Sequence, residues 1–244
     1  MMAKNIHELV EGFVSQALLL EKIRSSTFDL GVFKGLKSQA GRLKYASDNL
    51  QALSTSEDGS SRLVYLLSSK KVLKVARLNL KAPETFKRGI AQNQAEIENT
   101  KLIPNLVTKI FDQAPDQSWI VSELVRPLKN DKEFQALLGF RFDSLMMFFH
   151  DAYKDKFDVE KFNLHFKGAP SVYNDLLRME AWEAFPDVLA TLKNPEKGLH
   201  PGDFSVLSHW GKTADGRVVL LDSGATYEVL TNHYGLYGED IFDV

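Results

Sequence analysis

A lysine and a glutamate stand where a buried ion pair could form. Lys74 lies in the middle of the apolar run Lys71–Ala76 (KVLKVA), which is typical of a strand. Because a buried ammonium without a partner is costly, its side chain either pairs with a carboxylate or points outward from a sheet edge. Glu96, in the helix-favouring stretch Ala91–Lys101, is the partner that we predict, and Glu98 is its rival on another face of that helix.

Two aspartates further along the chain could hold a metal ion. Asp203 and Asp222 each end an apolar element in a glycine-flanked turn, and they are 222 − 203 = 19 residues apart. A carboxylate at the end of a strand beside glycine is a common way to present oxygen to Mg²⁺. The alternative is that both carboxylates cap loops and turns by accepting backbone N–H groups.

The elements that must position these residues change in type along the chain. Helical spacing predicts helices at Ile6–Ile23 and Leu36–Leu50, followed by five antiparallel strands. Asp131–Asn194 is mainly helical, Gly198–Gly211 predicts a loop, and Val218–Leu221 predicts a short buried strand. This order indicates an α+β fold with two lobes. The five strands are expected near Leu50–Leu53, Arg62–Leu67, Lys71–Ala76, Leu106–Phe111 and Ser118–Val125.

In this order the charged residues resemble those of protein kinases. KVLK, which ends at Lys74, is similar to the strand lysine that holds the α- and β-phosphates of ATP. AEIE, with Glu96, is similar to the helix glutamate that pairs with this lysine. Asp203 stands in the place of the catalytic-loop aspartate, and Asp222 begins Asp-Ser-Gly in the place of the metal-binding triplet.

The resemblance covers roughly residues 50–226. WIVSELV, at residues 119–125, is similar to the strand that leads into the hinge, where backbone groups of Glu123 and Val125 would meet adenine. The phosphate loop has Gly59 as its one glycine, and Ser60 and Ser61 could donate hydrogen bonds there. The segment Gly59–Leu67 (GSSRLVYLL) also resembles small kinase-fold proteins of tailed bacteriophages, pseudokinases among them.

The chain departs from the kinase pattern in its charge and metal positions. Glu57 and Asp58 bring negative charge towards the phosphates, and the middle residue of the triplet is Ser223 instead of Phe. Ser208 replaces the asparagine that holds a second metal, and His209 follows it; either could coordinate through water. Because 244 − 222 = 22 residues follow Asp222, we expect no large platform for a protein substrate.

The resemblance implies a protein-kinase-like fold with two lobes. Its parts would be an N-terminal helical extension (1–49), a small sheet-rich lobe with one helix (50–127) and a reduced helical lobe (128–244). It also implies a divergent protein that binds ATP with Mg²⁺ and transfers phosphate, with Lys74 and Asp203 as catalytic residues. The departures leave a second hypothesis open, in which a pseudokinase scaffold or regulator acts by binding a partner protein.

Composition excludes several other classes of protein. The 244 residues include no cysteine, which excludes disulfides and thiol nucleophiles. A net charge of −2 gives no global attraction to nucleic acid, and we expect no such partner. Apolar runs are too short to span a bilayer and the charged start is unlike a signal peptide, so we expect a cytoplasmic protein, in the host cytoplasm if phage-encoded. A local basic face could still form from Arg42, Lys44, Arg77, Lys81, Lys87 and Arg88.

Overall fold

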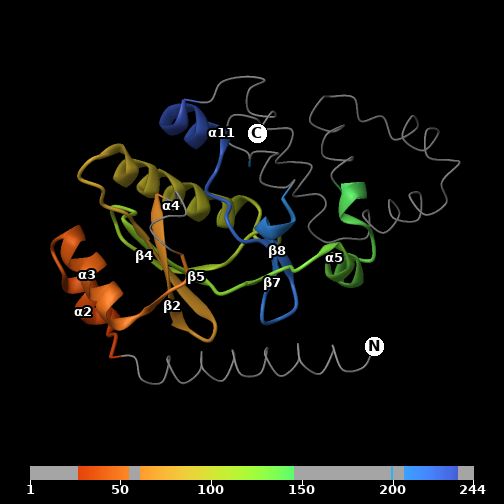
Figure 1. The fold of residues 1–244 in the computed structure, drawn as a ribbon, viewed down its shortest axis with the longest axis horizontal. Helices are drawn as coiled ribbons and strands as arrows, with labels where there is room; N and C mark the ends of the chain where they lie inside the picture. Colours follow the sequence, from red (N-terminus) through yellow and green to blue (C-terminus); the bar gives the residue numbers. More distant parts are fainter. Residues whose placement is uncertain (1–26, 55–60, 146–198, 200–205, 236–244) are drawn as a thin grey trace, which may run out of the picture.

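The fold is built around an antiparallel sheet of five strands (Figure 1). The computed structural model describes residues 27–54, 61–145, 199 and 206–235. The strand order is β1-β2-β3-β5-β4, and every neighbouring pair is antiparallel. The mixed α+β class and the five-stranded antiparallel sheet predicted from the sequence are confirmed. The strands are β1 (Gln51–Ala52), β2 (Arg62–Ser68), β3 (Lys71–Ala76), β4 (Ile110–Gln113) and β5 (Trp119–Glu123).

Two helices cover one face of this sheet. The side chains of Asp29 and Ser38 accept hydrogen bonds at the N-termini of α2 (Leu30–Gly35) and α3 (Gln39–Asn49), where backbone N–H groups need partners. Alternate side chains of β2, β3 and β5 meet these helices, because successive residues of a strand point to opposite faces. The first core consists of Phe33, Ala46, Tyr65, Leu73, Val75, Ala114, Trp119 and Val121.

A long helix, α4 (Glu84–Leu102), lies against the opposite face. Gly89 permits its close approach, since a Cβ there would stand 2.6 Å from Ser61 O and 2.9 Å from Ala76 Cα. The helix predicted over Ala91–Lys101 is confirmed, and it begins seven residues earlier than expected, at Glu84 (91 − 84 = 7).

The pairing of β2 with β3 decides which charged side chains face α4. Arg62 pairs with Ala76, and Val64 pairs with Lys74. Directly paired residues share a face, and so do residues two apart in one strand. Arg62 and Lys74 therefore both point to the side of the sheet that α4 covers.

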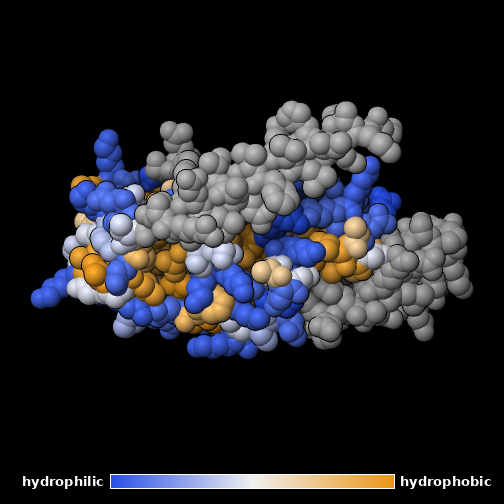
Figure 2. Space-filling model, turned by 90° about the horizontal axis from the view of Figure 1, so that it is seen from below, coloured by the Kyte–Doolittle hydropathy of each residue, from blue (hydrophilic) through white to orange (hydrophobic). Residues whose placement is uncertain are grey.

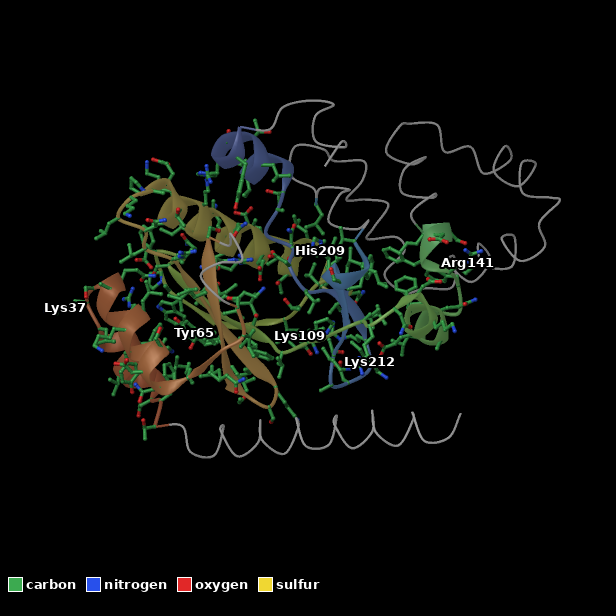
Figure 3. All side chains as sticks on the ribbon, viewed as in Figure 1. Lys37, Tyr65, Lys109, Arg141, His209 and Lys212 are labelled. Atoms are coloured by element: carbon green, nitrogen blue, oxygen red, sulfur yellow. The ribbon has the colours of Figure 1, made fainter. Side chains whose placement is uncertain are left out.

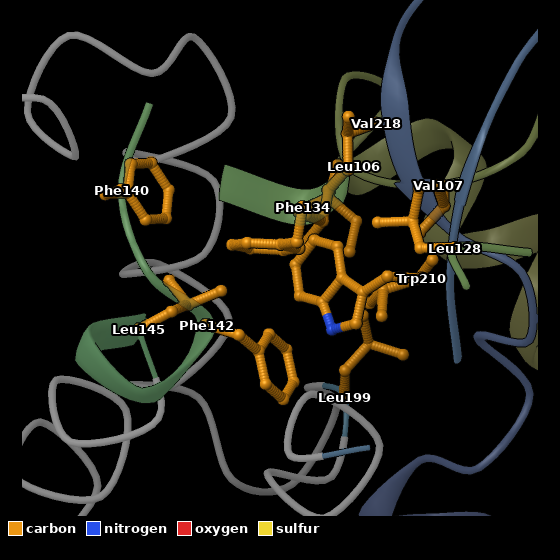
Figure 4. Close-up of a cluster of buried hydrophobic side chains, with 12 residues drawn as sticks. Leu106, Val107, Leu128, Phe134, Phe140, Phe142, Leu145, Leu199, Trp210 and Val218 are labelled. Carbon is orange, nitrogen blue, oxygen red and sulfur yellow. The ribbon is translucent and has the colours of Figure 1, made fainter. Parts of the chain in front are cut away.

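A second, three-stranded sheet is formed by β6 (Arg126–Pro127), β7 (Trp210–Lys212) and β8 (Val218–Leu220), in that order. Helix α5 (Asp131–Leu138) contributes Phe134, whose ring meets that of Trp210 edge to face at 5.8 Å (Figure 4). The second core consists of Ile103, Leu106, Val107, Leu128, Phe134, Phe140, Phe142, Leu145, Leu199, Trp210, Val218 and Leu220.

The prediction of a loop over Gly198–Gly211 was wrong at the C-terminal end of that segment. Leu207–His209 form a 3₁₀ turn, η1, and Trp210 then begins β7. The Trp210 side chain is fully buried. Because burial of a large aromatic side chain is strongly favourable, this residue belongs to the second core instead of an exposed loop.

The segment between α4 and β4 joins the two sheets. Leu220 N–H donates to Leu106 O at 2.8 Å, and Val107 forms a parallel bridge with Leu220. The strand predicted over Leu106–Phe111 therefore begins later, at Ile110, because Leu106 is used in the second core.

After β8 the chain returns to α4 through α11 (Tyr227–Val229) and η2 (Leu230–Tyr234). Gln92 Nε2 donates to the hydroxyl of Tyr234 at 3.1 Å, and the Arg88 guanidinium lies 4.6 Å from the centre of the Tyr234 ring. These contacts hold η2 against the side of α4 that faces away from the sheet.

The face of the molecule seen in Figure 2 mixes hydrophobic and hydrophilic residues. Among the described residues, no helix is both long and apolar enough to cross a membrane. The helix predicted at Ile6–Ile23 lies outside the described residues. Of the helical region predicted over Asp131–Asn194, residues 131–145 are described, and α5 is part of them.

Candidate functional site

Lys74 and Glu96 form a buried ion pair between β3 and α4. Lys74 Nζ donates to both carboxylate oxygens of Glu96 at 2.8 Å and to Leu221 O at 3.1 Å. The two side chains are 7% and 1% exposed, so the pair explains how a lysine occupies the middle of an apolar strand. Glu98 is exposed and accepts a hydrogen bond from Gln94, so Glu96 is the partner of Lys74.

Arg62, at the start of β2, belongs to the same cluster and was missed from the sequence. Its Nη1 donates to Glu96 Oε1 at 2.5 Å and to Asn93 Oδ1 at 3.2 Å. Its Nη2 donates to Asp222 Oδ1 at 2.9 Å. Burial alone would lower the pKa of Arg62, but the carboxylates of Glu96 and Asp222 outweigh it and raise this pKa above its ordinary value. Side-chain alternation from Lys74 across the β2–β3 pair is the signal that could have found it.

Asp222 lies just beyond β8 and closes the cluster. Its Oδ1 accepts hydrogen bonds from Arg62 Nη2 and from Gly224 N–H, the latter at 3.0 Å. Desolvation raises the pKa of this carboxyl, but the positive charges of Arg62 and Lys74 outweigh it and hold the pKa well below its ordinary value. The side chain of Asp222 is 52% exposed, so its carboxylate reaches the surface while the guanidinium of Arg62 does not.

The turn that carries Asp222 is bonded to α4. Asn99 Nδ2 donates to Ser223 O at 2.7 Å, and Asn99 is buried. A Cβ on Gly224 would stand 3.0 Å from the Cβ and O atoms of Gln92, so the turn lies against the helix. One helix therefore positions both Glu96 and the turn after β8.

The cluster joins two cations to two anions from four separate parts of the chain. Arg62 comes from β2, Lys74 from β3, Glu96 from α4 and Asp222 from the turn after β8. Guanidinium and ammonium groups with oriented N–H donors suit phosphate oxygens. Carboxylate oxygens suit a divalent metal, but only if they are free to coordinate it.

A divalent metal fits this arrangement poorly. Asp222 Oδ1 already accepts two hydrogen bonds, and both oxygens of Glu96 accept from Lys74. Among the residues that the structure describes, no three His, Asp or Glu side chains come together as metal ligands. Of the other predicted ligands, Ser208 is exposed, and His209, near β8 in Figure 3, accepts a hydrogen bond from Leu221 N–H through its backbone oxygen at 2.9 Å.

Ser61 is the described part of the predicted phosphate loop. Its hydroxyl donates to Gln92 Oε1 at 2.5 Å, and the side chain is buried against α4. The hydroxyl therefore binds the helix in this arrangement. Gly59, Ser60 and the predicted catalytic residue Asp203 lie outside the described residues.

The predicted adenine-binding segment follows the end of β5. Glu123 N–H donates to Lys109 O at 2.9 Å, and the Glu123 carboxylate accepts from Arg217 Nη2 at 2.6 Å. Val125 is buried, and its Cγ1 would stand 2.5 Å from a Cβ on Gly211. The amide and carboxylate of Glu123 are thus used to join β5 to neighbouring segments.

Ser122, just before this segment, has an unusual environment. Ser122 pairs with Val72 and Ile120 pairs with Lys74, so Ser122 and Lys74 lie on the same face of the sheet. Ser122 is fully buried, and its Oγ has no hydrogen-bond partner among the described residues. A buried hydroxyl without a partner is a group that a polar ligand could satisfy.

The candidate site thus consists of three residues that the sequence singled out and one, Arg62, that it did not. Lys74, Glu96 and Asp222 come together as the sequence predicted, and Arg62 links the last two. No family model, no curated protein and no solved structure matches this chain.

Proposed function

We propose that the protein is a divergent, kinase-like phosphotransferase that binds ATP beside β3, α4 and the turn after β8. The observation that carries this proposal is the double hydrogen bond from Lys74 Nζ to the buried carboxylate of Glu96. The same Nζ donates to the backbone oxygen of Leu221, the residue just before Asp222. A lysine held by a buried carboxylate presents a fixed positive charge, and kinases use such a lysine to orient phosphates.

Each residue has a defined part in this proposal. Lys74 would hold the phosphates, and Glu96 would orient Lys74. The segment from Ser122 to Val125 would contact the base. One polar group there is the Ser122 hydroxyl, which has no hydrogen-bond partner within the described part of the chain. Asp203 would accept the hydroxyl proton of the acceptor while the acceptor oxygen bonds to the γ-phosphorus and ADP leaves. Mg²⁺ stays a prediction, because the cation beside Asp222 in this structure is Arg62.

A thermal-shift titration with ATP, with and without Mg²⁺, tests the proposal. A ligand at 100 times its dissociation constant stabilises the folded protein by about 2.7 kcal/mol, which raises Tm measurably. Lys74→Ala should lose this shift. Lys71→Ala is the matched control, because Lys71 lies in the same strand and rests over the Phe111 ring, 4.6 Å from its centre. A folded wild-type protein that shows no shift under either condition contradicts the proposal.

The second candidate function is a pseudokinase scaffold that acts through a partner protein. The ion pair between Arg62 and Asp222 favours it, because it occupies the carboxylate that kinases use for the metal. Turnover of γ-labelled ATP separates the two functions. A wild-type protein that binds ATP but releases no labelled phosphate and labels no acceptor, including water, would support the scaffold.

A further inference from the structure

Arg62 stands where a cation is needed beside Asp222. Its Nη2 donates to Asp222 Oδ1 at 2.9 Å, and the side chain is 3% exposed. We infer that Arg62 replaces the divalent metal at this site, so that the site binds the phosphates of a nucleotide without Mg²⁺. The inference rests on the proposed ATP-binding function and names its metal requirement.

The guanidinium is fixed from the side away from Asp222. Nη1 donates to Glu96 Oε1 and Asn93 Oδ1. Asn93 is itself oriented, because its Nδ2 donates to Gln117 O at 2.7 Å and leaves Oδ1 facing Arg62. Two side chains of α4 therefore hold the Arg62 guanidinium in addition to Asp222.

A metal at Asp222 would have to compete with this resident charge. It would bring two further positive charges beside a guanidinium that sits within hydrogen-bond distance of the same carboxylate, and like charges at such a distance repel. A metal bound at Oδ1 would also compete with the N–H of Gly224. Arg62 brings no further charge to the site, because its charge is part of the folded chain, and it shares Oδ1 with the N–H of Gly224.

Phosphate can enter by replacing the carboxylate of Asp222. Asp222 is 52% exposed, whereas the side chains of Arg62 and Glu96 are 3% and 1% exposed. Asp222 is therefore the member of the cluster with room to turn towards solvent. When it turns, Nη2 of Arg62 can donate to a phosphate oxygen. The groups that remain, Arg62, Lys74 and Glu96, have a formal charge of +2 − 1 = +1, which attracts an anion.

Binding of the fluorescent nucleotide mant-ATP, measured in EDTA and in Mg²⁺, tests the inference. We expect the wild-type protein to bind in EDTA with nearly the same Kd as in Mg²⁺. Asp222→Asn should bind more tightly in EDTA, by up to about tenfold, because it removes the charge that competes with phosphate. Asp215→Asn is the matched control, since Asp215 is also bonded to an arginine, Arg217, but in the turn between β7 and β8. It should leave Kd unchanged.

The outcomes separate the inference from the proposed function. Wild-type binding only in Mg²⁺, or loss of binding in Asp222→Asn, overturns the inference and leaves ATP binding intact. No binding by the folded protein under either condition overturns both.

Binding of Mn²⁺, followed by electron paramagnetic resonance, gives a second test that needs no nucleotide. Wild-type protein and Asp222→Asn should bind Mn²⁺ equally, because Asp222 is not a metal ligand while Arg62 holds it. Arg62→Met should gain a Mn²⁺ site, because Asp222 is then free to coordinate the metal. The double variant Arg62→Met/Asp222→Asn should lack that site. If Arg62→Met does not fold, the first comparison still decides: weaker Mn²⁺ binding in Asp222→Asn than in the wild type overturns the inference.

Discussion

Arg62 Nη2 and Asp222 Oδ1 lie 2.9 Å apart, although 160 positions separate the two residues in the chain. The contact joins the first residue of β2 to the turn after β8, and the same guanidinium also bonds to Glu96 on α4. The side chain of Arg62 therefore links the five-stranded sheet, helix α4 and the turn that follows the second sheet.

Glu96→Gln should destabilise the protein strongly. Arg62 and Lys74 both rely on this carboxylate, and removing one member of a buried charge cluster typically costs about 3–5 kcal/mol. Urea unfolding measures the change. Glu98→Gln, two positions along the same helix and exposed, should change the free energy of unfolding by less than about 0.5 kcal/mol. Equal stability of the two variants would contradict the buried cluster.

Gly89→Ala should destabilise the packing of α4 on the sheet. The added Cβ would meet the backbone at Ser61 O and Ala76 Cα, closer than such contacts allow, and overpacking of this kind costs about 1–3 kcal/mol. Gly35→Ala is the control, because a Cβ on this helical glycine meets nothing within 4 Å. It should be neutral or gain up to about 1 kcal/mol from the better helix propensity of alanine. A shift in Tm of the same sign in both variants would refute the close approach.

Stability in acid should depend on Asp222. Because Arg62 and Lys74 hold its pKa below the ordinary value of 3.8, the carboxylate contributes stability above that value and loses it as pH falls through the native pKa. Asp222→Asn should therefore be less stable than wild type near neutrality, and the difference should shrink as pH falls. Urea unfolding at a series of pH values measures this. Asp48→Asn, at an exposed ion pair on α3, is the charge control; a gap between wild type and Asp222→Asn that does not narrow in acid would contradict the prediction.

Asn99→Ala should release the turn after β8 from α4. The variant leaves Ser223 O without its donor and should cost about 1–3 kcal/mol, as expected for a buried group that loses its hydrogen bond. Amide hydrogen exchange at Gly224 should also become faster. Gln94→Ala is the control, since Gln94 is exposed on the same helix. Unchanged exchange at Gly224 would show that Asn99 does not position the turn.

The pairing of Lys74 with Glu96 could be predicted from the sequence because each residue has a strong local context. A lysine within an apolar strand needs a partner, and a helix follows the hairpin at a suitable distance. Arg62 has no such context, because it stands at the border between a polar loop and a strand, where an exposed side chain is the ordinary expectation. Its burial depends on Asp222 and on the position of α4, which are non-local features.

The second sheet was harder to predict for a related reason. β7 has only three residues, including Gly211, so it shows little of the alternation that marks a strand. Its partners are β6, which lies far away in the sequence, and β8. The burial of Trp210 among side chains from α5 and from the segment before β4 completes it. The pairing with β6 and the packing of Trp210 are long-range and leave no local signal in the amino-acid pattern.

The bond between Leu220 N–H and Leu106 O has a consequence for how the protein can move. The chain passes from the first sheet to the second at residues 124–125, and a lone crossing of that kind could serve as a pivot. Leu106 provides a separate attachment, anchored in the second core. Swinging one sheet away from the other would break this hydrogen bond, so we expect the two sheets to keep a fixed spacing.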